Sequence, residues 1–327
     1  MLQDEMPALV DQPGHRGNRL NEAQQYRPIP PSNHGRVDPA RPSSNWTARR
    51  SARGRDSSAT FSSMATWTAS DGTEIAFEMT GSGPPLVLVH GITESRRNFD
   101  PLVPAIEAHH TVLSVDLRGH GESQRRAPYD LATFASDVHE VVGQVGIGDD
   151  ALLVGHSLGG LVVTSYAAHY PCRGVLNIDQ PLELTGLQEG LLQLAQMLRG
   201  DEATFRASIA MVFAGLRGPL EGAELARVEA LHRPDQDVVL GVWDVLLNCT
   251  PEQLDDVVRS IASAVHVPYL SLHGIDPGPD YAAWLQERIP TAIVEVWPDH
   301  GHYPHLINQR RFLERLDTFA ATLGEDR

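Results

Sequence analysis

Residues 155–159 read Gly-His-Ser-Leu-Gly and separate two segments of different character. The run 151–154 is short and apolar, as expected of a buried strand, and residues 158–169 have the apolar content of a helix. Between a strand and a helix, Gly-x-Ser-x-Gly predicts a sharp turn in which the glycines leave room for neighbouring backbone. We therefore expect Ser157 to stand above the edge of a sheet, at the start of a helix.

The same strand–helix alternation extends on both sides of this turn. The expected strands are short runs rich in apolar residues: 64–67, 73–79, 86–89, 111–115, 151–154, 175–178, 267–272 and 293–296. The expected helices of this part are 99–108, 131–145, 158–169, 281–288 and 310–323. Strands that alternate with helices predict the α/β class, with a mostly parallel central sheet covered by helices on both faces.

The alternation stops between the sixth and seventh strands. Residues 181–264 contain only amphipathic helical segments, at 187–198, 202–214, 222–231, 238–247 and 251–264. We expect this segment to be a helical cap inserted between strands 6 and 7 of one core domain, which comprises residues 64–180 and 265–327. Residues 1–63 are rich in Pro, Ser, Asn, Gly and Arg without apolar periodicity, which predicts a disordered tail.

A serine hydroxyl is a weak nucleophile and needs a base. His302 is the candidate, because it lies in the loop directly after strand 293–296, where a side chain can reach over the carboxyl edge of the sheet. The base in turn needs a carboxylate, and Asp276, just past strand 267–272, is the expected one. Asp179, after strand 175–178, is a rival in the same kind of position. The order serine, acid, histidine holds with either aspartate.

An oxyanion that develops on the substrate needs two donors. The N–H of Leu158 lies at the first turn of the helix after the serine, and the N–H of Ile92 lies in the loop after strand 86–89. Gly91 would let this loop approach closely. We expect Ile92 and Leu158 to form the oxyanion hole.

Five segments occur in order: His-Gly-Ile at 90–92, Asp-Leu-Arg-Gly-His-Gly-Glu-Ser at 116–123, and the motifs that begin at Gly155, His273 and Gly301. Together they resemble the α/β-hydrolase superfamily across residues 64–323, and most closely its cap-bearing serine hydrolases: esterases, perhydrolase-like enzymes and carbon–carbon bond hydrolases. The resemblance implies the roles given above, and a bracing role for Asp116 and Arg118. Epoxide hydrolases are also similar but carry aspartate where this chain has Ser157.

Composition excludes several functions. The chain has 26 basic and 42 acidic residues, a net charge of −16, which speaks against nucleic acid and anionic membranes as partners. Two distant cysteines and the absence of a long apolar run predict a cytoplasmic protein. The spacing of His300, His302 and His305 does not fit a metal site, so we expect neither metal nor cofactor. The pattern leaves the oligomeric state open.

We therefore expect a hydrolase that cleaves an ester, thioester, lactone or related acyl bond of a small, largely apolar substrate through an acyl-enzyme. Two alternatives use the same scaffold: a carbon–carbon bond hydrolase or lyase, and a non-catalytic receptor for a small ligand. Turnover of a simple ester separates the receptor from the enzymes.

Overall fold

The computed structural model describes residues 63–324 and confirms the α/β architecture. Its eight-stranded sheet has the order β1-β2-β4-β3-β5-β6-β7-β8, in which β1, β2 and β4 pair antiparallel and β3 to β8 run parallel. The strands are β1 Ser63–Thr68, β2 Glu74–Gly81, β3 Pro85–Val89, β4 Thr111–Val115, β5 Leu152–His156, β6 Gly174–Ile178, β7 Tyr269–His273 and β8 Ala292–Val296. The expected tail, residues 1–63, lies outside the described residues except for Ser63.

Twelve α-helices are found in the described part of the chain. Those of the core are α1 Val103–Ile106, α2 Leu131–Val145, α3 Leu158–His169, α10 Tyr281–Arg288, α11 Pro304–Ile307 and α12 Gln309–Thr322. Between β6 and β7 lie α4 Thr185–Leu198, α5 Glu202–Leu216, α6 Gly222–Leu231, α7 Gln236–Val242, α8 Asp244–Asn248 and α9 Pro251–Ala262. We call residues 181–264, which contain these six helices, the helical insertion.

The sheet is buried on both faces. Successive residues of β3 divide between two apolar clusters, with Val87 and Val89 in one and Leu86 and Leu88 in the other. Helices α2 and α3 contribute to the first cluster, whereas α1 and α12 contribute to the second. This two-sided burial explains why the central strands read as continuous apolar runs.

Two expected helices are not continuous in the structure. In the segment 99–108, Phe99 ends the short 3₁₀ turn η2 (Arg96–Phe99) and only the four residues of α1 are α-helical, because Pro101 and Pro104 have no N–H to continue a helical ladder. The segment 238–247 is divided at Trp243, where α7 ends and α8 begins.

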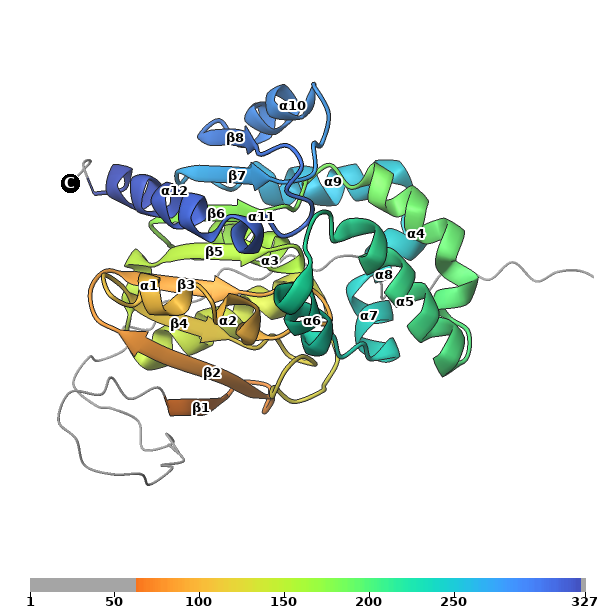
Figure 1. Ribbon diagram of the computed structural model, residues 1–327, viewed down its shortest axis with the longest axis horizontal. Helices are drawn as coiled ribbons and strands as arrows, with labels where there is room; N and C mark the ends of the chain where they lie inside the picture. Colours follow the sequence, from red (N-terminus) through yellow and green to blue (C-terminus); the bar gives the residue numbers. More distant parts are fainter. Residues whose placement is uncertain (1–62, 325–327) are drawn as a thin grey trace, which may run out of the picture. The chain divides into compact units, whose positions relative to one another are not determined.

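The parallel strands β3 and β5 to β8 end at one edge of the sheet, and the helical insertion lies beside that edge (Figure 1). The hydrogen bond from the N–H of His302 to the carbonyl of Leu216, 2.9 Å long, confirms that the insertion contacts the loop after β8. The loops that follow the carboxyl ends of the strands are therefore the ones brought together under the insertion.

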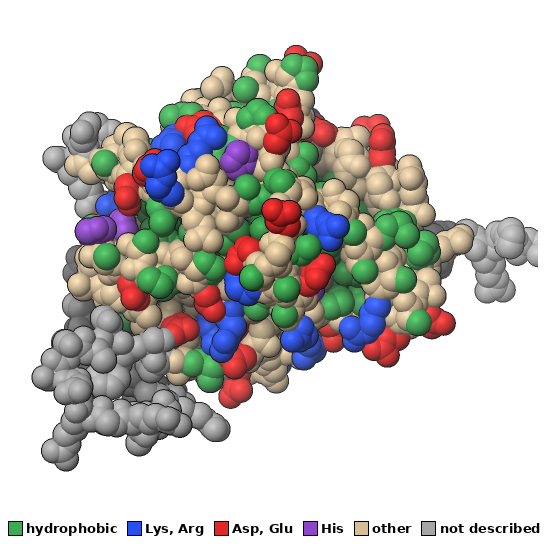
Figure 2. Space-filling view, viewed as in Figure 1, with side chains coloured by type: hydrophobic (Ala, Val, Ile, Leu, Met, Phe, Trp, Pro, Cys, Tyr) green, Lys and Arg blue, Asp and Glu red, His purple; other side chains and the backbone are tan. Residues whose placement is uncertain are grey.

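Acidic and basic side chains are interspersed on the face drawn in Figure 2, so this face carries no continuous basic surface.

The close approach of β5 to α3 generates a prediction. A Cβ at Gly155 would lie 2.1 Å from the carbonyl oxygen of Gly159, so Gly155→Ala must force the backbone apart. We expect Gly155→Ala to lower the free energy of unfolding by about 3 kcal/mol, measured by urea denaturation. Gly143→Ala, in the last turn of α2 with nothing within 4 Å of the added methyl, should raise it by up to about 1 kcal/mol. Equal stability of the two variants would contradict the packing described.

Candidate active site

Ser157 occupies the strained turn expected from its motif. Its φ of 52° and ψ of −123° lie outside the regions that L residues favour, and its N–H donates to the carbonyl of Ile178, 3.0 Å away. The first turn of α3 packs closely on the end of β3, since a Cβ at Gly159 would lie 2.1 Å from the carbonyl oxygen of Val89. Ser157 is therefore held at the carboxyl edge, next to the loop after β3.

That neighbouring loop begins with His90 and Gly91. The Nε2 atom of His90 accepts a hydrogen bond from the N–H of Leu117 at 3.1 Å, so the ring proton resides on Nδ1 and is donated to the carbonyl of Gly91 at 2.7 Å. Burial lowers the pKa of His90 and favours this neutral form. Because the Gly91 carbonyl and the Ile92 N–H belong to one planar peptide group, His90 fixes the direction of the Ile92 N–H.

The two expected donors of the oxyanion hole lie on adjoining segments. A Cβ at Gly91 would lie 3.2 Å from the Cβ of Ser157, which places the loop of Ile92 directly against the serine. Leu158 is the first residue of α3, and the N–H groups of a first helical turn have no acceptor within their own helix. The geometry thus brings the loop of Ile92 and the first turn of α3 to the same serine.

His302 lies in the loop after β8 and is buried. Its Nδ1 atom is 2.6 Å from Oδ2 of Asp179, while its Nε2 atom is buried without a hydrogen-bond partner among the described residues. The ring packs on His156, the residue before Ser157, with ring centroids 4.7 Å apart, and Nε2 of His156 donates to the carbonyl of His302 at 2.8 Å. The histidine loop is therefore attached to the residue that precedes the serine.

Asp179 follows β6 and also has a left-handed backbone, with φ of 52°. Its Oδ1 atom accepts hydrogen bonds from the N–H groups of Gly274 and Ile275, at 2.7 and 3.0 Å. Burial opposes ionisation of this carboxyl, but the hydrogen bond and charge of His302, together with these two N–H groups, outweigh it and lower the pKa of Asp179. Asp179 is therefore an ionised carboxylate bound to Nδ1 of His302.

The expected contact between Asp276 and His302 is not formed in the structure. The Asp276 side chain is exposed, and its Oδ1 atom accepts from the N–H of Gly278 at 2.9 Å, which closes a local turn. The loop after β7 supplies the backbone N–H groups of Gly274 and Ile275 to Asp179 instead of supplying the carboxylate. Asp179, the second candidate from the sequence, contacts His302 instead, because β6 pairs with β5 and its end lies next to the turn of Ser157.

A buried carboxylate missed by the sequence analysis lies behind the oxyanion loop. Glu94 accepts hydrogen bonds from the hydroxyl of Tyr303 at 2.9 Å and from Nδ2 of Asn98 at 2.8 Å. Its Oε2 atom is 3.6 Å from Nδ1 of His156. These contacts connect the loop after β3 with the end of β5 and with the loop after β8. No local motif marks Glu94, because its partners Tyr303 and His156 are distant in sequence.

The three neighbouring histidines have separate roles. His300 is bonded through Nδ1 to the carbonyl of Pro298 at 2.8 Å, and His305 is buried with Nε2 donating to Oδ1 of Asn98 at 2.8 Å. Only His302 of the three contacts a carboxylate at hydrogen-bond distance in the described residues. Within residues 63–324, no group of three or more potential ligands is arranged to hold a metal ion.

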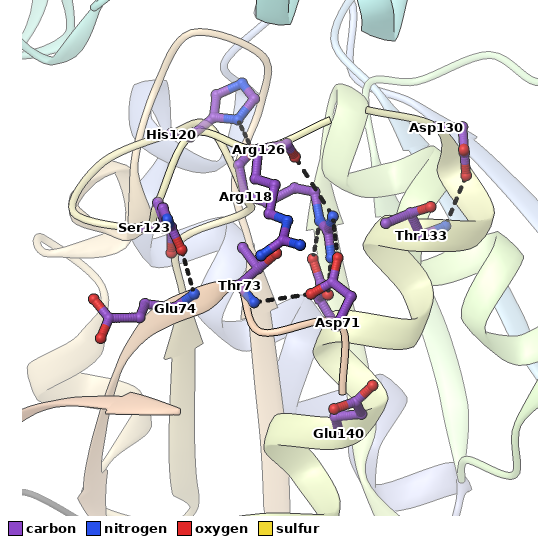
Figure 3. A network of polar contacts seen from close by, with 12 residues as sticks. Asp71, Thr73, Glu74, Arg118, His120, Ser123, Arg126, Asp130, Thr133 and Glu140 are labelled. Carbon is purple, nitrogen blue, oxygen red and sulfur yellow. Dashed lines mark hydrogen bonds and ion pairs between the residues drawn. The ribbon is translucent and has the colours of Figure 1, made fainter. Parts of the chain in front are cut away.

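The segment 116–123 braces the β3 side of the site. Asp116 accepts from the N–H groups of Arg96 and Glu122, at 2.7 and 2.9 Å. Arg118 forms a two-pronged hydrogen bond to Asp137 of α2, with both distances 2.6 Å. Figure 3 shows its side chain also reaching Asp71 in the turn between β1 and β2, 3.0 Å away. The bracing role implied by the resemblance agrees with these contacts.

Comparisons with known proteins identify the family of the chain. Residues 86–315 match the model of the "Alpha/beta hydrolase family". The chain is 35% identical over 274 residues to "Uncharacterized protein Rv2715" of Mycobacterium tuberculosis, covering 76% of this chain and 78% of that protein. It is 28% identical over 251 residues to a pimeloyl-[acyl-carrier protein] methyl ester esterase of Neisseria meningitidis, covering 72% and 89%. Its fold is similar to the crystal structure of the esterase RhEst1 from Rhodococcus sp., with TM-score 0.60, 25% identity and coverage of 80% and 99%. None of the helices within residues 63–324 combines the length and the apolar character needed to span a membrane.

The burial of Glu94 gives a prediction for acid stability. Burial opposes its ionisation, but the interactions with His156, His232 and Tyr303 prevail and hold its pKa far below the ordinary value. A carboxyl with a lowered folded pKa stabilises the fold above its unfolded pKa, and this contribution is lost as the pH falls toward the folded value. We expect Glu94→Gln to reduce the slope of unfolding free energy against pH by up to about 1.4 kcal/mol per unit between roughly pH 4 and pH 2.

The matched control is Glu189→Gln, which changes an exposed glutamate of α4 in the same way. Urea unfolding at a series of acid pH values measures both slopes. A slope for Glu94→Gln equal to that of the control would show that Glu94 is not an ionised buried group.

Proposed function

Because the chain belongs to the alpha/beta hydrolase family and is an α/β-fold hydrolase, we propose that it is a serine hydrolase of small, largely apolar acyl compounds. Its substrate would be an ester, thioester, lactone or related acyl compound. The observation that carries the proposal is the state of His302, whose Nδ1 is bound to a carboxylate while Nε2 is left without a partner among the described residues. A histidine in this state is equipped to accept a proton from a serine.

In the proposed reaction, Ser157, His302 and Asp179 form the catalytic triad. Nε2 of His302 removes the hydroxyl proton as the oxygen of Ser157 attacks the substrate carbonyl. The proton passes to the leaving group, the acyl–oxygen or acyl–sulfur bond breaks, and an acyl-enzyme remains. Water then attacks the acyl group, with His302 as base. The bond between the acyl carbon and Oγ of Ser157 breaks, the proton on His302 returns to Oγ, and the acid leaves. Asp179 keeps the Nδ1 proton in place and stabilises the imidazolium.

The N–H groups of Ile92 and Leu158 form the proposed oxyanion hole. Support comes from the contact of Gly91 with Ser157 and from the bond of His90 to the Gly91 carbonyl, which orients the Ile92 peptide group. Donors that are fixed before the reaction need no reorganisation when charge develops on the substrate oxygen. We further propose that the helical insertion acts as a cap over this site, because it contacts the loops after both β3 and β8.

The nucleophile is tested by covalent labelling. A fluorophosphonate probe should label Ser157, and the protein should hydrolyse a short p-nitrophenyl ester. Ser157→Ala should lose the label and at least about 1,000-fold of the activity, because the remaining site has no nucleophile. Peptide mapping by mass spectrometry and ester kinetics check the two results. Wild-type turnover by Ser157→Ala would refute the mechanism, whereas labelling without any turnover would favour a ligand receptor.

The acid is tested by a matched pair of substitutions. Asp179→Asn keeps the shape of the side chain but favours the wrong histidine tautomer, and we expect kcat to fall by roughly 100-fold or more. Asp276→Asn changes an exposed turn residue and should leave kcat within about 3-fold of the wild type. Steady-state kinetics and the melting temperature of both variants are the measurements. If Asp276→Asn were the slower enzyme while folded, the assignment would have to be reversed.

A further inference from the structure

Thr93, the residue after Ile92, is held by the helical insertion. Its side-chain oxygen is 2.7 Å from Nδ1 of His232, which lies at the end of α6. Its carbonyl accepts a hydrogen bond from the N–H of Arg233 at 2.8 Å. Two consecutive residues of the insertion thus bind the hydroxyl and the carbonyl of one residue in the loop after β3.

Thr93 is also strained, with φ of 65°, and only 2% of its surface is exposed. A β-branched residue adopts a left-handed backbone only where its surroundings enforce it. On the side of the core, two residues hold the conformation of this loop. His90 donates to the Gly91 carbonyl, and Glu94 accepts from Tyr303 and Asn98. On the other side the enforcing contacts come from His232 and Arg233 of the insertion.

The position of His232 suits this role. Its ring packs against Phe213 of α5, with centroids 4.2 Å apart, so the imidazole has a fixed orientation. Burial lowers the pKa of His232, the charge of Glu94 opposes this shift, and His156 and His302 reinforce it. The ring is therefore neutral at physiological pH. Its contact with Thr93 brings this neutral ring against the loop after β3, although His232 belongs to the insertion.

We propose that His232 is a positioning residue for the oxyanion hole, which acts by fixing Thr93 and through it the peptide group that carries the Ile92 N–H. This inference rests on the proposed function and deepens it, because it makes assembly of the oxyanion hole depend on the insertion. The insertion also binds the histidine loop, through the Leu216 carbonyl and the His302 N–H. Docking of the insertion therefore orders the anion-binding loop and the loop of the base together.

The test uses three substitutions in the full chain. His232→Phe keeps a ring against Phe213 but removes the bond to Thr93, and Thr93→Val removes the hydroxyl at nearly constant shape. His232→Asn keeps a polar atom near the position of Nδ1 and should rescue the function. His266→Phe, at an exposed histidine outside the site, is the matched control.

We expect His232→Phe and Thr93→Val each to lower kcat/KM for a p-nitrophenyl ester by about 10-fold. Affinity for a boronic acid, which forms a tetrahedral adduct with the serine, should fall by a similar factor. The kcat/KM of the double variant should be no lower than that of the less active single variant, because both substitutions remove the same hydrogen bond. His232→Asn should stay within about 3-fold of the wild type, and His266→Phe should equal it.

A second measurement does not depend on activity. Hydrogen exchange of the peptide that contains residues 91–95, followed by mass spectrometry, should become at least about 10-fold faster in His232→Phe, with an unchanged melting temperature. Faster exchange in a protein that never hydrolyses esters or binds boronates would support the positioning role and refute the proposed function. Unchanged exchange and unchanged kcat/KM in His232→Phe, or losses that multiply in the double variant, would overturn the inference about His232.

Discussion

The backbone of Ser157 keeps its left-handed conformation because hydrogen bonds act on both sides of the residue. Its N–H is bound to the carbonyl of Ile178 in the neighbouring strand, and its own carbonyl accepts from the N–H of Gly160 at 2.7 Å. The turn is possible only while β3, β5 and β6 keep their parallel register, since α3 begins against the end of β3. The sheet therefore determines where the serine stands, and the remaining groups of the site are arranged around it.

Left-handed residues recur at this edge of the sheet. Thr93, Ser157 and Asp179 follow β3, β5 and β6, and each has a positive φ without being glycine. A residue that turns sharply at the end of a strand directs its side chain along the edge instead of continuing the sheet. Such conformations cost roughly 1–3 kcal/mol each and persist where tertiary contacts enforce them. The stability of the two buried cores, one on each face of the sheet, offsets this cost.

The sequence predicts what is encoded locally. Helices 131–145, 158–169, 222–231 and 281–288 agree with the structure in both bounds. Local signals mark the first of them best, since its apolar residues follow the helical repeat and the Asp130 side chain caps it by accepting from the N–H of Thr133 at 2.8 Å. The places of Ser157 and His302 follow from motifs within a few residues. The choice between Asp179 and Asp276 could not follow in this way, because both stand after buried strands at the same edge and only their tertiary partners differ. The sequence did not reveal the roles of Glu94 and His232 for the same reason, since their contacts join segments far apart in the chain.

The carboxylate that binds His302 stands at the point where the chain leaves the core for the insertion. Only residues 180–184 separate Asp179 from α4, while Arg233 and Leu216 of the insertion bind Thr93 and His302 through their backbones. A different insertion could replace this one only if it restored these contacts to two loops of the core. A change of substrate preference would therefore need fewer coordinated changes through point substitutions within residues 181–264 than through replacement of the whole segment.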